Sequence, residues 1–109
     1  MTGHEPLSMR SVPIDGGVRL TFTGEIDMAT ADGVRWSLET AIGEHDHVEA
    51  DLAGVTFIDS YGLRALVSTH GVVPAGSGSF NIIAASPQVK RTFAVTGLDL
   101  AYLWPSERN

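Results

Sequence analysis

The 109-residue sequence contains no cysteine and no long apolar run. The absence of cysteine excludes disulfides, a thiol nucleophile and thiolate metal ligands, and it is compatible with a reducing compartment. No run approaches the roughly 20 apolar residues that span a bilayer. The polar residues 1–6 also lack the layout of a signal peptide. We therefore expect a soluble, cytoplasmic protein that makes no use of the membrane.

Basic residues are scarce as well, since seven Lys and Arg stand against thirteen Asp and Glu, for a net charge of -6. This balance argues against binding to nucleic acid. Residues 1–59 hold eleven carboxylates and three arginines, a net charge of -8, whereas residues 60–109 hold two carboxylates and four cations, a net charge of +2. An acidic first half suits docking to a basic protein partner, and it suits solubility alone equally well.

The length and the apolar content indicate one globular domain. A chain of 109 residues has the commonest size of a single domain, and an apolar share of 43% is ordinary for a folded protein. We expect one domain over residues 1–109, with frayed tails at 1–6 and 105–109. Such a domain has a core but little room for a deep catalytic cavity.

Hydrophobic periodicity predicts strands and helices that alternate. Period-two or apolar runs predict strands at 7–12, 18–23, 47–52 and 80–84, and three- and four-residue spacing predicts helices at 30–42, 60–70 and 87–96. A weaker apolar run suggests a last strand at 98–104. The expected boundaries are Pro13 and Gly24 after the first two strands and Gly43 and Gly97 after the first and last helices.

The order β-β-α-β-α-β-α-(β) predicts an α/β fold. The first two strands form a hairpin, and the following crossovers require parallel pairing, so we expect a mixed, mostly parallel sheet of four to five strands with three to four helices. Trp36 is assigned to the core, although it falls beside the apolar stripe that contains Val34 and Leu38. Trp104 suits either the core or a contact surface.

The segment 59–62, Asp-Ser-Tyr-Gly, lies where a strand is expected to turn into a helix. In open α/β sheets, sites gather at this edge. A phosphate on Ser60 would face unpaired N–H groups and the positive end of the helix dipole, and it would add about -1.5 to -2 charges. Ser60 is therefore a suitable place for a switch. An ordinary N-cap by Asp59 or Ser60 explains the same residues at least as well, and both can hold at once.

Three blocks of the sequence resemble STAS domains of the bacterial anti-sigma factor antagonist family. The family signature is similar to residues 51–63, DLAGVTFIDSYGL. Residues 23–31 resemble the exit from the second strand and the start of the first helix, and residues 86–98 resemble the third helix. The blocks follow the order and spacing of the family over about 18–98, which makes the resemblance specific.

The resemblance implies a function without catalysis or a cofactor. Such antagonists bind an anti-sigma factor, usually a serine kinase of the GHKL ATPase type, and so free a sigma factor. The kinase phosphorylates a serine after the aspartate of the motif, which corresponds to Ser60, and a PP2C-type phosphatase reverses the step. The acidic residue implicated in partner contact corresponds to Asp27. The expected partner-binding residues are Glu25, Asp27, Asp59, Ser60, Tyr61, Gly62 and Arg64. Isolated members are commonly monomeric, and we expect a monomer.

Several features depart from the family or suggest other chemistry. Many members carry a second serine or threonine where this chain has Tyr61, which is bulkier and could anchor a partner or narrow the choice of kinase.

His45 and His47 alternate, but no third metal ligand follows from their spacing, so we expect no metal. Serine hydrolysis by Ser60 would need a nearby base, and His70 lies ten residues along the same predicted helix.

Two other functions remain open. The domain could be an accessory or scaffold STAS domain, associated with a transporter or a stressosome, that has no phosphorylation cycle. It could also be a sensor that binds a nucleotide or lipid at residues 59–62.

Overall fold

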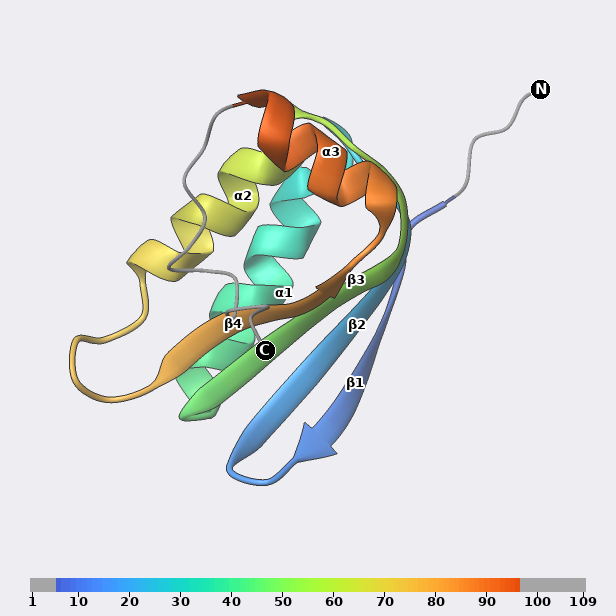
Figure 1. Cartoon of the computed structure of the whole chain (residues 1–109). Coiled ribbons are helices and arrows are strands. Elements are labelled where there is room, and N and C mark those ends of the chain that lie inside the picture. Colours follow the sequence, from blue (N-terminus) through green and yellow to red (C-terminus); the bar gives the residue numbers. More distant parts are fainter. Residues whose placement is uncertain (1–5, 97–109) are drawn as a thin grey trace.

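The computed structural model describes residues 6–96, which form four strands and three helices (Figure 1). The elements follow one another as β1 (Ser8–Ile14), β2 (Gly17–Ile26), α1 (Ala31–Glu44), β3 (His47–Ile58), α2 (Ser60–Gly71), β4 (Ser79–Ala85) and α3 (Pro87–Thr96). The order matches the prediction from the sequence. The predicted strand at 98–104, the helix end at Gly97, Trp104 and the tails, apart from Pro6, lie outside the described residues.

The strands form one sheet in the order β1-β2-β3-β4. β1 and β2 are an antiparallel hairpin, and β3 pairs in parallel with both β2 and β4. The mixed, mostly parallel sheet is therefore confirmed. Helices α1 and α2 lie side by side against one face of the sheet, while α3 lies across its upper end near β3 (Figure 1). Among residues 6–96, no helix covers much of the other face of the sheet (Figure 1).

The core lies between the sheet and the helices. Alternate residues of β2 and β3 point into it, and α1 and α2 each contribute one apolar stripe. Most of the residues predicted to face inward are buried: Val18, Leu20, Phe22, Val34, Leu38, Ala41, Val48, Ala50, Leu52, Leu63, Leu66, Val89, Phe93. Ile42 and Val67, also predicted to face inward, are only partly buried, and Ala94 of the predicted stripe on the last helix is exposed. On the outer side of β3, Glu49 is partly exposed, and its Oε1 accepts a hydrogen bond from the Nε of Arg19 on β2 at 3.0 Å.

Three predicted strand ends are wrong. The largest error concerns β3, which was predicted to end at Leu52 and continues to Ile58. β1 continues through Pro13 to Ile14, because β1 is an edge strand and the missing N–H of proline costs less there. β2 continues past Gly24 to Ile26, because Gly24 takes a φ of +102° and shifts in register on both sides of it keep the strand paired with β3. Gly24 is therefore an irregular position inside β2 and does not end it. Because the strand continues, its last residues reach the candidate functional site.

The predicted end of the first helix and the place of Trp36 are also wrong. α1 passes Gly43 and ends at Glu44, since Gly43 has no left-handed φ and does not break the turn. Trp36 is 69% exposed, because it lies off the buried stripe of α1. Within residues 6–96 the longest helix has 14 residues, and none of the helices there is long and apolar enough to cross a membrane.

Candidate functional site

The site lies where the carboxyl ends of β2 and β3 meet. Ile26 and Ile58 are the last paired residues of these two parallel strands. The chain leaves β2 through residues 27–30 into α1, and it leaves β3 through Asp59 into α2. The Asp59 N–H donates to the Ile26 carbonyl at 3.2 Å, so the two exits are held together. Ser60 is the first residue of α2 and is exposed.

The Asp59 carboxylate joins the two exits a second time. Its Oδ1 accepts the N–H of Gly62 at 3.0 Å and so caps α2, while its Oδ2 accepts the N–H of Met28 at 3.1 Å. The predicted cap at Asp59 is therefore confirmed. Both oxygens are engaged within the chain, so Asp59 positions Ser60 and the loop before α1.

The loop before α1 is fixed by Asp27 and Thr30. The Asp27 Oδ1 accepts the N–H of Ala29 at 2.9 Å. The Thr30 hydroxyl accepts the N–H of Asp27 at 2.9 Å and lies 3.1 Å from the Glu25 carbonyl, to which it donates. Asp27 thus shapes the loop beside Ser60. Glu25 is half-buried at the end of β2.

Gly62 is required by the close approach of α2 to both strands. It is buried, and a Cβ there would lie 2.6 Å from the Ile58 Cγ1 and 2.8 Å from the Ile26 Cγ2. Real Cβ atoms essentially never come so close, so any side chain would push α2 away. Gly62 therefore contributes to the site through packing, with no side chain to offer a partner.

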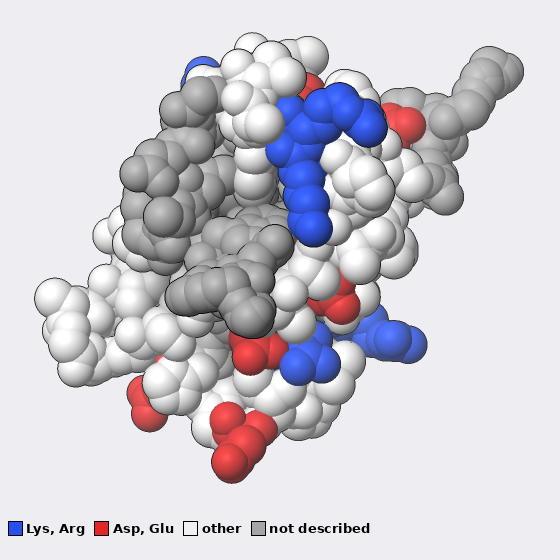
Figure 2. Space-filling view, in the orientation of Figure 1, with Lys and Arg blue, Asp and Glu red and all other residues white. Residues whose placement is uncertain are grey.

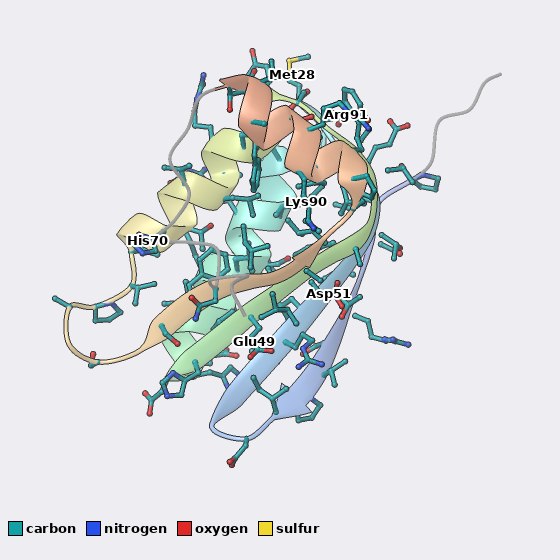
Figure 3. The ribbon with its side chains drawn as sticks, viewed as in Figure 1. Met28, Glu49, Asp51, His70, Lys90 and Arg91 are labelled. Carbon is teal, nitrogen blue, oxygen red and sulfur yellow. The ribbon has the colours of Figure 1, made fainter. Side chains whose placement is uncertain are left out.

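Around Ser60 the surface is partly apolar. Tyr61 is 47% exposed and Met28 is 67% exposed, and both border a shallow groove of about 340 Å³ between the starts of α1 and α2. Figure 3 shows Met28 at the end of the molecule where α2 begins. Arg64 lies over the Tyr61 ring, with its guanidinium carbon 5.7 Å from the ring centroid. Large exposed apolar side chains next to an arginine are typical anchors of protein interfaces.

Charges of both signs surround the groove. Asp32, Arg35 and Arg64 border it. Lys90 and Arg91 of α3 form a separate basic area, with carboxylates such as Asp51 and Glu49 over the strands below it (Figures 2 and 3). The acidic character of residues 1–59 therefore does not produce a uniformly acidic surface at the groove.

Two other kinds of chemistry considered from the sequence are serine hydrolysis and metal binding. Ser60 and His70 lie at opposite ends of α2, about 15 Å apart at 1.5 Å per residue, so they cannot act as a nucleophile and its base. The His47 Nδ1 lies 2.9 Å from the Ser79 hydroxyl. No cluster of three metal-ligating side chains occurs in the part of the chain that the structure describes.

The sequence predicts that one site contains Asp27, Asp59, Ser60 and Tyr61. The structure places these residues at one end of the sheet. The prediction missed Met28, whose exposed side chain borders the groove and whose N–H binds Asp59. The available signal was an apolar residue directly after Asp27, outside any predicted element. The prediction also missed Arg35 on α1, which falls off the buried stripe.

Comparison with known proteins decides the family. The model of the STAS domain matches residues 9–107. The chain belongs to the STAS domain family. This STAS domain is 31% identical over 107 residues to the anti-sigma-F factor antagonist RsfB of Mycobacterium tuberculosis, a match that covers 94% of this chain and 84% of the relative. The expected family is thereby confirmed.

Solved structures agree with the fold. An anti-sigma factor antagonist from Mycobacterium paratuberculosis superposes with a TM-score of 0.81 at 26% identity, covering 98% of this chain and 92% of that one. The anti-sigma factor antagonist SpoIIAA is similar in its unphosphorylated form, with a TM-score of 0.70 at 20% identity and coverage of 92% and 90%. The likeness to SpoIIAA shows the fold alone.

Proposed function

We propose that this STAS domain is an anti-sigma factor antagonist. In its unphosphorylated state it binds an anti-sigma factor of the GHKL serine kinase type and thereby frees a sigma factor. Phosphorylation of Ser60 by that kinase ends the binding, and a PP2C-type phosphatase restores it. The protein acts in the cytoplasm as a monomer and catalyses no reaction itself. The names of its relatives as antagonists support the partner class.

The observation that carries the proposal is the exposed Ser60 at the start of a firmly capped helix. Because Asp59 satisfies the N–H of Gly62, the Ser60 hydroxyl is not needed as the cap and is open to a kinase. A phosphate there would gain from the positive end of α2. It therefore adds charge to the surface without unfolding the helix.

The partner surface that we propose is the rim around Ser60, made of Met28, Tyr61, Arg64 and the groove that they border. The exposed apolar side chains would supply the buried contact area. Charged groups at the edge would fix orientation. A phosphate on Ser60 lies within this rim, so a bound partner would have to bury its charge, which costs free energy even where a cation lies beside it. That cost explains how one modification can end the binding.

Titration of candidate anti-sigma factor kinases from the same genome tests the proposal. We expect Ser60→Ala to bind the kinase about as well as the unmodified protein but to accept no phosphate when ATP is added. Ser60→Asp should bind at least about tenfold more weakly, which corresponds to 1.4 kcal/mol. Mass spectrometry should locate the phosphate of the wild-type protein on Ser60.

A control separates the position of the charge from its presence. Ser11 is an exposed serine in the middle of the edge strand β1, where it pairs with Leu20, so Ser11→Asp adds the same charge away from the rim. It should leave the affinity for the kinase within about twofold of wild type. Equal binding by Ser60→Asp and the wild type would refute the charge switch. If no anti-sigma factor binds the unmodified protein, an accessory or scaffold role without a phosphorylation cycle takes its place.

A further inference from the structure

Arg64 lies one helical turn after both Ser60 and Tyr61 on α2. Residues three and four positions apart face each other on a helix, so both side chains are neighbours of Arg64. In the unphosphorylated protein the Arg64 guanidinium lies over the Tyr61 ring, with its central carbon 5.7 Å from the ring centroid. In the described part of the chain, Arg64 forms no ion pair with a carboxylate. Its charge is therefore not already committed to an acidic group there.

Two hollows flank the Arg64 side chain. The groove of about 340 Å³ contains Arg64 together with Tyr61. A second hollow, of about 260 Å³, contains Arg64 together with Ser60. Because Arg64 is exposed and borders both, rotation about its own side-chain bonds can carry the guanidinium from one hollow to the other. No movement of the backbone is needed.

Once Ser60 carries a phosphate, the interactions of the Arg64 guanidinium in the two hollows differ in strength. A cation–π contact at an exposed site is a weak interaction. A guanidinium–phosphate pair is charge-assisted and can form two parallel hydrogen bonds, and the fixed fork of arginine suits that geometry. The nearby Asp59 carboxylate would oppose the phosphate, although its oxygens already accept the N–H groups of Met28 and Gly62. The phosphate is therefore the stronger partner for Arg64.

We infer that Arg64 is the counter-ion of phosphorylated Ser60 within this chain, and that phosphorylation transfers its guanidinium from the Tyr61 ring to the phosphate. The inference rests on the proposed function only because it requires that Ser60 is phosphorylated. It does not depend on which partner the protein binds. One modification then has two effects on the rim. It adds a partly neutralised negative charge, and it removes the arginine from one face of Tyr61.

The second pKa of the phosphate, which is ordinarily near 6, measures the pairing directly. Phosphoserine can be incorporated at position 60 during translation, so no kinase is required. A nearby cation favours the dianion and lowers this pKa. In a ³¹P NMR titration, Arg64→Gln should therefore raise the phosphate pKa by about half a unit, the size expected for an exposed charge pair.

Arg35→Gln is the matched control, since it removes the same charge from the same groove but from α1. It should change the phosphate pKa by less than about 0.2 units, because exposed charges that make no direct contact are screened. Equal shifts in the two variants would overturn the inference, because they would mean a general field with no specific pair. Each variant is first checked for a thermal transition close to that of the wild type.

The position of Arg64 gives a second readout. In the unphosphorylated protein, the ring current of Tyr61 should shift the Arg64 side-chain protons upfield, and Tyr61→Leu should abolish that shift. Phosphorylation of Ser60 should move the same protons back toward their random-coil positions. Unchanged shifts after phosphorylation would contradict the transfer. These measurements use the isolated protein, so they can succeed or fail independently of binding to an anti-sigma factor.

Discussion

The Asp59 carboxylate should stabilise the domain as well as position Ser60, and its removal gives the sharpest test of the site's construction. Asp59→Ala removes the cap on the Gly62 N–H and the bond to the Met28 N–H. A lost N-cap costs about 1 kcal/mol, and a lost hydrogen bond to a charged group costs about 1.5 kcal/mol or somewhat less where the bond is exposed, as it is at Met28. We therefore expect a loss of about 2 kcal/mol in the free energy of unfolding.

Asp59→Asn separates the two bonds. Asparagine caps a helix as well as aspartate does, but its amide group cannot accept the Met28 N–H while its oxygen serves the cap. About half of the loss should therefore remain. Asp32→Ala is the control, because its carboxylate is 96% exposed in the first turn of α1, and it should cost less than about 0.5 kcal/mol. Urea unfolding at 25 °C measures all four proteins. A stability of Asp59→Ala within 0.5 kcal/mol of the wild type would refute the bridging role.

Four further substitutions test the packing and the helix caps. Gly62→Ala should destabilise the domain by about 1–3 kcal/mol, because the added Cβ has no space between α2 and the strands, whereas Gly33→Ala, in an open helical position, should stabilise it by up to about 1 kcal/mol. Thermal unfolding with opposite shifts in midpoint would confirm this pair, and equal shifts would contradict it. Ser86→Ala removes the hydroxyl that donates to the Val55 carbonyl at 2.6 Å and caps α3, so chemical denaturation should show a loss of about 1–2 kcal/mol. Trp36→Ser should change stability by less than about 0.5 kcal/mol, and a larger loss would mean that this exposed side chain is buried in solution.

Much of the fold follows from periodicity in the sequence. The clean alternation of Val18, Leu20 and Phe22 and the helical spacing of Val34 and Leu38 gave the right elements, because each has one buried face. Alternation failed in the second half of β3. After Leu52 the buried residues follow at steps of three, a spacing that does not show an alternating strand.

The candidate site was partly predictable because its key residues are close in sequence. The Asp59 cap and the exposed Ser60 follow from the start of a helix after a strand. The contact between Asp59 and Met28 joins residues 31 positions apart, and it depends on the parallel pairing of β2 and β3. Such a contact has no local signal. The exposure of Trp36 could have been predicted from its place beside the stripe.

The affinity of the unmodified and the Ser60-phosphorylated protein for the anti-sigma factor kinase tests the central claim most directly. Calorimetric titration of both forms, with the sigma factor present in a parallel series, gives the two dissociation constants and the extent of sigma factor release. We predict tight binding and release for the unmodified form, with binding at least about tenfold weaker and no release for the phosphorylated form. Equal dissociation constants for the two forms would contradict the proposal that the phosphate on Ser60 controls the complex.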